Sequence, residues 1–252
     1  MKKNLWLNIG FQVGALLLAV LITMLILVAA GAPPFKAYAS IFKGAFGSEN
    51  NIVSVLITWS PLLLTTAGVL ITFSAGLWNI GVEGQMTLGA IFATWGLRLL
   101  QDANLPPFLT ILLAIILGMI GGAIWAGLAG ALKTFGGVNE IFGGLGLNFV
   151  STALTIYLVF GPWKRPGVGS MSGTQPFDEK LWLPTLPGTG LSLWSLGISI
   201  LVVVIVYLRL RGTYCGLKLK AVGKNMKSAF LLGVPTWQYS MFAFLLCGAF
   251  AG

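Results

Sequence analysis

Apolar stretches alternate with short polar ones along almost the whole chain. A helix needs about 20 residues to cross the hydrocarbon core of a bilayer, and most of the apolar stretches approach or exceed that length. The pattern therefore predicts an all-α, polytopic transmembrane helical bundle, which we take as a single transmembrane domain over residues 1–252. The expected spans are 11–30, 52–73, 86–100, 109–132, 145–161, 193–210 and 237–252.

The polar stretch WNIGVEGQMTLGA, residues 78–90, separates the second of these spans from the third and overlaps the start of the third. It carries one carboxylate, Glu83, and two amides, Asn79 and Gln85. The apolar run after it, 86–100, is too short to cross alone, so we expect this helix to begin partway through the membrane. Polar groups and irregular backbone survive there only inside protein or beside water. The pattern predicts a broken helix that lines a route through the membrane.

A second polar stretch, FGGVNEIFGGLGLNF at residues 135–149, precedes the short run 145–161. Asn139 lies beside Glu140, and Asn148 follows eight residues after Glu140, which places Glu140 and Asn148 on one helix face. Residues 52–100 and 109–161 thus share a plan of a long helix, a polar break with one Glu, and a short helix. Such a repeat is typical of transporters, although glycine is abundant enough here to produce it by chance.

These polar side chains have a structural alternative to a role in the route. A carboxylate at the centre of a membrane helix costs at least ~2.5–3.5 kcal/mol, so a functional or paired role is expected for Glu83 and Glu140. Either could instead lie at the cytoplasmic interface or accept hydrogen bonds from backbone amides at the break. The amides could hydrogen-bond a polar solute or satisfy unpaired backbone groups.

Composition places the protein in the membrane: 57% of its residues are hydrophobic and 8% are charged, against about 25% charged in soluble domains. The net charge of +9 comes from basic residues at span ends and in short loops, which favours contact with lipid headgroups over nucleic acid. The predicted topology puts nine of the 15 basic residues, Lys2 and Lys3 among them, on the cytoplasmic side, so the N-terminus is expected inside. Residues 11–30 are long for a cleaved signal peptide, despite the Ala-Gly-Ala that follows.

The residues needed for common enzyme chemistry are missing from the sequence. It has no histidine, two cysteines placed far apart, and six acidic residues that are mostly scattered at span ends. This pattern predicts neither a metal site nor a catalytic site. The spacing from Gly216 to Lys224 differs from that of a phosphate-binding loop, so no cofactor is expected on this chain.

The most basic segment, 211–235, is predicted to be a cytoplasmic loop with a short helix at 226–232. Asn225 is placed to cap the start of this helix and Gly233 its end. Such a helix can dock into a groove of a soluble partner or rest on anionic lipid, and the spacing alone does not choose between these.

Three motifs together resemble the permease subunits of ABC importers, and most closely the branch that carries nucleosides and simple sugars. They are WNIGVEGQMTLGA, then GGVNEIFGGLGLNF leading to GPWK, and GLKLKAVGKNMKSAFLLGV. Residues 142–144 depart from the Ser/Thr-bearing pattern of these permeases. The family's permeases are longer, and the last apolar run stops at Gly252 without a polar flank, so we expect a chain truncated at its C-terminus.

The resemblance implies an ABC importer permease fold in a bacterial plasma membrane. It implies three kinds of partner: a second permease subunit, cytoplasmic ATP-binding subunits that hold the ATP, and an external solute-binding protein. It places Asn79, Glu83 and Gln85 at the translocation pathway and assigns coupling to the ATPase to Lys220, Ala221, Gly223, Asn225, Ala229 and Gly233. The alternative from the residues is an ion-coupled secondary transporter that uses Glu83 and Glu140 as proton sites.

Overall fold

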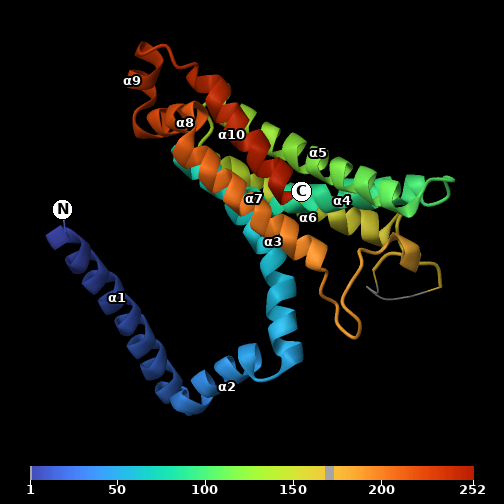
Figure 1. Cartoon of the computed structure of the whole chain (residues 1–252), viewed down its shortest axis with the longest axis horizontal. Coiled ribbons are helices and arrows are strands. Elements are labelled where there is room, and N and C mark those ends of the chain that lie inside the picture. Colours follow the sequence, from blue (N-terminus) through green and yellow to red (C-terminus); the bar gives the residue numbers. More distant parts are fainter. Residues whose placement is uncertain (1, 168–172) are drawn as a thin grey trace. The chain divides into compact units, whose positions relative to one another are not determined.

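A computed structural model describes residues 2–167 and 173–252, with backbone only for 2–6 and 8. The regular secondary structure of the described residues is helical, apart from an isolated bridge between Lys164 and Thr174. The side chains of Lys2 and Lys3, which are predicted to be cytoplasmic, and residues 168–172 lie outside the described residues. The elements (Figure 1) are α1 (Lys2–Ala29), α2 (Pro34–Phe46), α3 (Glu49–Ser74), α4 (Val82–Leu100), α5 (Pro107–Thr134), α6 (Glu140–Phe160), η1 (Glu179–Leu181), α7 (Leu193–Gly212), α8 (Tyr214–Lys224), α9 (Met226–Leu231) and α10 (Thr236–Ala251).

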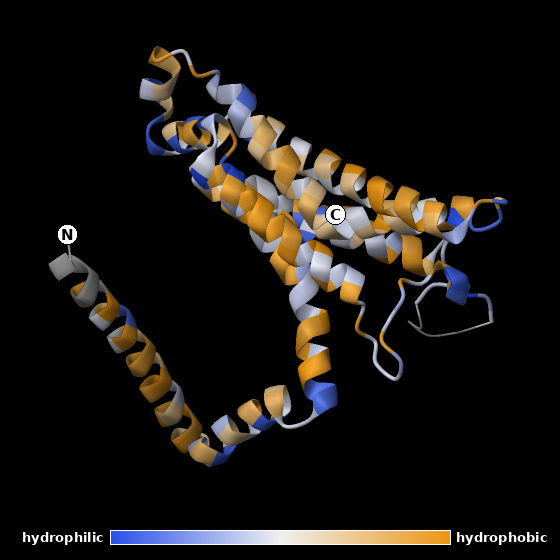
Figure 2. Ribbon diagram, in the orientation of Figure 1, coloured by the Kyte–Doolittle hydropathy of each residue, from blue (hydrophilic) through white to orange (hydrophobic). Residues whose placement is uncertain are grey.

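The all-α, multi-span architecture predicted from the sequence is confirmed. Five helices in the described residues are long and apolar enough to cross a membrane, namely α1, α3, α5, α6 and α7. Apolar residues predominate along α5 and α7 in Figure 2. The predicted spans 52–73, 109–132, 193–210 and 237–252 match α3, α5, α7 and α10 to within three residues.

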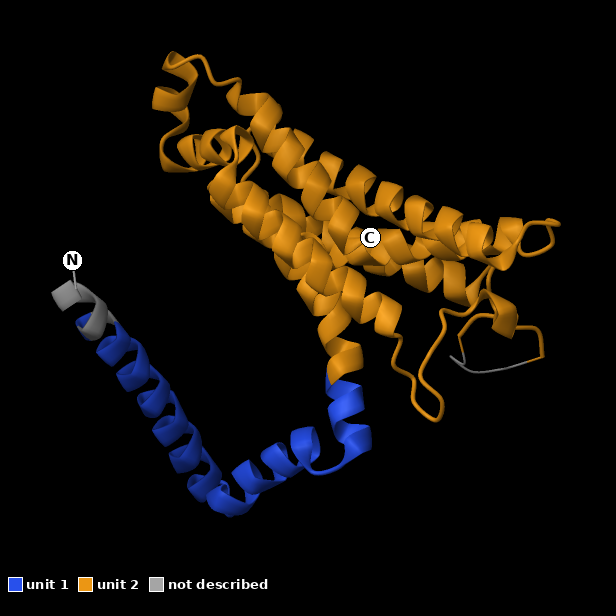
Figure 3. Cartoon of the chain, in the orientation of Figure 1, with its two compact units in different colours: residues 1–55 blue, residues 56–252 orange. Residues whose placement is uncertain are grey.

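The chain divides into two compact units, residues 1–55 and 56–252 (Figure 3). The single domain over 1–252 therefore stays a prediction. In the first unit, the helix α2 follows α1 and has proline at its first turn, a position that proline favours. Phe35, Phe42 and Phe46 on α2 are exposed beside Lys43. This combination is typical of a helix that lies at a membrane surface.

In the second unit, α5 packs closely against α4 and α10 through glycines. Gly118, Gly122 and Gly130 form the contact, because a Cβ on any of them would meet neighbouring atoms at 3.0 Å or less. A Cβ at Gly122 would meet the Gly248 carbonyl on α10, and one at Gly248 would meet the Gly122 carbonyl. Small residues let membrane helices approach in this way.

We expect Gly248→Val to destabilise the bundle by about 1–3 kcal/mol, the usual cost of overpacking. The matched control is Gly146→Val on α6, where a Cβ meets nothing within 4 Å. Thermal unfolding of the purified proteins in detergent compares the two. Equal melting temperatures for the two variants would contradict the packing assigned to Gly248.

The helices that follow the two polar stretches, α4 and α6, begin earlier than the sequence predicts. The helix expected from residue 86 starts at Val82, and the one expected from 145 starts at Glu140. Glu83 and Glu140 therefore lie in first turns, where the positive end of the helix dipole stabilises a carboxylate. With 21 residues, α6 is long enough to span, so the prediction that it is too short is wrong.

The predicted interruption before α4 is present and lies inside the bundle. A Cβ at Gly84 would lie 2.8 Å from Nε1 of Trp125. Trp125 is nine residues before the end of α5 at Thr134. At 1.5 Å per residue, the start of α4 therefore lies beside a point on α5 that is ~14 Å from the C-terminal end of that helix. The second link, residues 135–139, instead directly follows the end of α5.

The basic segment contains two helices where the sequence predicted one. The helix α8 was missed because Thr213, Gly216 and Gly223 favour turns; in the structure the Thr213 hydroxyl accepts a hydrogen bond from the Gly216 amide at 3.2 Å and caps α8. The caps predicted for α9 are confirmed. Asn225 accepts from the Ser228 amide at 3.0 Å, and Gly233 has a φ of 80° in the left-handed turn after the helix.

Candidate functional site

The break between α3 and α4 covers residues 75–81. Gly76 has a φ of 72°, and the Leu77 amide donates to the Thr72 carbonyl at 2.9 Å, which is the Schellman geometry that glycine permits. This turn directs the chain back into the bundle, where Leu77 is only 2% exposed. Buried and exposed residues thus alternate along the break, with Ala75, Leu77, Asn79 and Gly81 turned inward.

Two amide side chains pair across this break. Asn79 Nδ2 donates to Gln85 Oε1 at 3.1 Å, and Gln85 Nε2 donates to Asn79 Oδ1 at 2.9 Å. Asn79 Nδ2 also lies 3.0 Å from the sulfur of Cys247 on α10. The exposed fractions of Asn79 and Gln85 are 4% and 0%. The pair is therefore a closed polar contact between the break, α4 and α10.

Asn148 on α6 also binds the break between α3 and α4. Its Oδ1 accepts from the Gly84 amide at 2.9 Å, and its Nδ2 donates to the Ile80 carbonyl at 3.2 Å. A Cβ at Gly144 would lie 2.7 Å from the Gly81 nitrogen, so α6 and the break touch through their backbones. Asn148 thus satisfies backbone groups that the break leaves free.

Glu140 and Asn139 have local roles at the start of α6. The Glu140 carboxylate lies 2.6 Å from Lys133 Nζ, and the side chain of Glu140 is 10% exposed. Asn139 Oδ1 accepts from the Ile141 amide at 2.9 Å and caps the helix. This ion pair ties the ends of α5 and α6 together, and sequence reasoning missed Lys133 as the partner of Glu140.

Glu83 lies in the first turn of α4 and is exposed on the surface of the chain. Among the described residues it has no ion pair. Within the two polar stretches, 78–90 and 135–149, several large apolar side chains are exposed: Trp78 at 59%, Met86 at 37%, Phe142 at 73% and Phe149 at 76%. A carboxylate that faced lipid at the centre of a membrane helix would cost at least ~2.5–3.5 kcal/mol.

The predicted coupling residues lie on α8, α9 and the turn after α9. Lys220, Gly223 and Asn225 are exposed, Ala221 is half-buried and Ala229 is 2% exposed. A Cβ at Gly223 would lie 2.8 Å from the Gly76 nitrogen, and one at Gly76 would lie 2.9 Å from the Gly223 Cα. The helix α8 therefore touches the break directly, backbone against backbone.

The outer side of α9 and its turn presents large apolar side chains. Met226 is 44% exposed, Phe230 66%, and Leu231 and Leu232 83% each. Lys224 and Lys227 are exposed in the same segment. An exposed apolar patch with a polar rim is typical of a docking surface for another protein.

Residues 51–252 match the family model described as branched-chain amino acid transport system / permease component. The chain is 32% identical to the glucose ABC transporter permease protein TsgB13 of Haloferax volcanii, an alignment that covers 98% of this chain and 66% of that protein. It is 26% identical to the nucleoside ABC transporter permease protein NupB of Lactococcus lactis (94% and 67% covered) and 27% to the guanosine ABC transporter permease protein NupP of Bacillus subtilis (94% and 68%).

The chain thus spans about two thirds of the length of the curated relatives it matches. No solved structure matches it.

Proposed function

Because the chain belongs to the branched-chain amino acid transport system permease component family, we propose that it is the membrane-spanning permease of an ATP-driven importer. Relatives named for glucose, nucleosides and guanosine support a nucleoside or simple sugar as its substrate. On this proposal, the chain is a multi-pass protein of a bacterial plasma membrane with its N-terminus in the cytoplasm. It binds no cofactor, and catalysis takes place on its partners.

The observation that carries this proposal is the exposed carboxylate of Glu83 next to the break between α3 and α4. The start of α4 lies ~14 Å from the C-terminal end of α5, measured along that helix. A carboxylate at such a place is stable next to a water-filled passage. Because Glu83 is exposed among the described residues, the passage runs along this face of α4. A second permease subunit, the same or related, supplies the opposite wall.

In the conformation described, the amides of Asn79 and Gln85 bond to each other. This pair keeps the route closed. Opening separates the two side chains and frees their donors and acceptors for the hydroxyl groups of a solute. Asn148 keeps the break in place from α6 while this happens, and an external binding protein delivers the solute.

ATP-binding subunits drive this opening through α8 and α9. The apolar side chains of Phe230, Leu231 and Leu232 provide the surface to which such a subunit docks. The contact between Gly223 and Gly76 then transmits the displacement of α8 to the break. Backbone atoms in direct contact cannot move toward each other, so a push on α8 has to shift the break.

An ion-coupled carrier that uses Glu83 and Glu140 as proton sites receives less support. The Glu140 carboxylate is already paired with Lys133 at 2.6 Å, so it is not free to act as a carrier site. Glu83 alone remains as a candidate for a proton site.

Uptake of radiolabelled glucose and guanosine tests the proposed function, in cells deleted for the gene and in cells complemented with it. We expect complementation to restore uptake of at least one of them, ATP depletion to abolish that uptake, and a protonophore to leave it largely intact while ATP is maintained. Uptake that survives ATP depletion and collapses with the protonophore would establish the ion-coupled carrier instead.

A further inference from the structure

A cavity of about 280 Å³ lies between α3, α7, α8 and α10, away from the amide pair. Its inner wall consists of buried apolar side chains, with Ile71 and Val206 at 4% exposure and Leu219 at 3%. Its outer part includes Ile205 at 45% and Phe242 at 42% exposure. The volume is slightly below the ~300–1,000 Å³ of drug-sized pockets, so the cavity fits a segment of one acyl chain.

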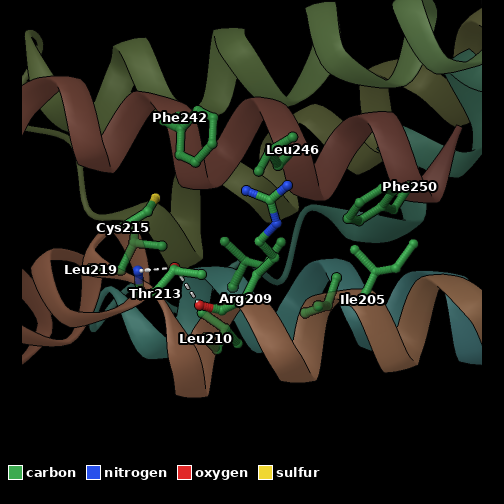
Figure 4. Close-up of a pocket in the computed structure, with 12 residues that line it drawn as sticks. Ile205, Arg209, Leu210, Thr213, Cys215, Leu219, Phe242, Leu246 and Phe250 are labelled. Atoms are coloured by element: carbon green, nitrogen blue, oxygen red, sulfur yellow. Dashed lines mark hydrogen bonds between the residues drawn. The ribbon is translucent and has the colours of Figure 1, made fainter.

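One charged residue, Arg209, lines this otherwise mostly apolar cavity. Figure 4 shows its guanidinium directed from α7 into the cavity, toward the helix that carries Phe242 and Leu246. The described residues offer this guanidinium no ion pair. A guanidinium provides five donors in a planar fork that matches a phosphate group.

Three of the helices that line the cavity, α7, α8 and α10, contain no acidic residue. The sequence contains no Asp or Glu after Glu179, whereas Arg209, Arg211, Lys218, Lys220, Lys224 and Lys227 follow it. The acidic residue of α3 is Glu49, which is in its first turn, and Ile71 of the cavity is in its last. The cavity thus combines an apolar wall with an exposed arginine at its edge that has no ion-pair partner among the described residues.

From this combination we infer that the cavity is a binding site for an anionic phospholipid. An acyl-chain segment occupies the space among Val206, Leu246 and Phe250, and the headgroup phosphate accepts hydrogen bonds from Arg209. Charge complementarity selects this occupant: a zwitterionic lipid gains less beside a cluster of basic residues, and a soluble anion leaves the apolar wall uncovered. Because α8 also forms a wall of the cavity, the lipid lies against the same helix that touches the break at Gly223.

Native mass spectrometry of the purified full-length protein tests this site, with dioleoyl phosphatidylglycerol and dioleoyl phosphatidylcholine titrated separately. We expect the wild type to prefer phosphatidylglycerol and Arg209→Gln to lose about fivefold in affinity for it, the factor that corresponds to one basic residue near an anionic lipid surface. The matched control is Arg211→Gln. Arg211 contacts Tyr207 instead and does not line the cavity, so this variant should bind as the wild type does.

A second variant tests the apolar wall independently of the charge. Leu246→Trp fills the cavity and should reduce retention of phosphatidylglycerol even though Arg209 is intact. Equal affinity of Arg209→Gln and wild type for phosphatidylglycerol would overturn the inference, as would full retention by Leu246→Trp. Complete displacement of the lipid by millimolar glycerol phosphate would also overturn it, since it would identify a site for soluble phosphate. None of these readouts depends on transport, so the result is independent of the proposed function.

Discussion

We expect Gly223→Ala to abolish most of the proposed ATP-driven uptake while the bundle stays folded. The added Cβ would meet the Ser74 carbonyl and lie 2.9 Å from the Ala75 carbonyl carbon and 2.8 Å from the Gly76 nitrogen. Backbone cannot give way as a flexible side chain does, so α8 has to move away from the break. We expect a tenfold or larger loss of uptake. A change of ~1.4 kcal/mol in the free-energy difference between the closed and open states of the break already changes their ratio tenfold. Uptake and ATP hydrolysis by the assembled transporter are measured together, and hydrolysis that continues without uptake is the expected sign of uncoupling.

The matched control for Gly223→Ala is Gly212→Ala at the end of α7, where a Cβ meets nothing within 4 Å. A second pair of variants, Gly76→Ala and Gly137→Ala, distinguishes the effect of the contact with α8 from the effect of backbone strain. Gly76 and Gly137 have φ values of 72° and 65°, so alanine is strained by a similar ~1–2 kcal/mol at both. A Cβ at Gly137 contacts nothing, whereas one at Gly76 meets Gly223. Unchanged uptake by Gly223→Ala, or equal losses for Gly76→Ala and Gly137→Ala, would refute the assigned coupling contact.

The second large effect is expected at the buried amide pair. Asn79→Leu leaves the Gln85 amide without its partner inside the protein, and an unsatisfied buried polar group costs about 1–3 kcal/mol. Gln85→Met should destabilise the protein similarly. The double variant removes both polar groups and should regain at least half of the lost stability. Melting temperatures of the purified proteins measure this coupling.

Transport distinguishes a gate from a merely structural contact. All three variants should lose uptake by about tenfold or more, because an apolar surface cannot replace the hydrogen bonds that a polar solute requires when it leaves water. The double variant should therefore recover stability without recovering uptake. Recovery of both would mean that the two amides only hold the fold together and do not line the route.

Local patterns were sufficient to predict much of the fold. The length of an apolar run depends only on neighbouring residues, so the helices α3, α5, α7 and α10 were predicted to within three residues. The caps at Asn225 and Gly233 were predictable for the same reason, since capping involves residues within a few positions of each other. The start of α6 was missed because Glu140 was assigned to the break, although a carboxylate also stabilises the first turn of a helix.

The partners of the site residues could not be predicted from local patterns. Asn79 and the Cys247 sulfur are 168 positions apart, and Asn148 and the Gly84 amide 64, so only the packed bundle brings them together. The sequence predicted Asn79, Gln85 and Asn148 as one group with Glu83, Asn139 and Glu140. The structure joins the first three around one break, whereas Asn139 is a cap and Glu140 pairs with Lys133.

The position of Glu83 tests the central claim most directly. Glu83→Cys, in a chain whose half-buried Cys215 is replaced by serine, is exposed to a membrane-impermeant thiol reagent in the assembled transporter; Cys247 is fully buried and stays in place. The account predicts that the reagent labels residue 83 at a rate that changes on addition of ATP and falls with transported solute. Labelling by lipid-soluble reagents alone, unaffected by ATP or solute, would place this residue in the bilayer and contradict a passage beside the break.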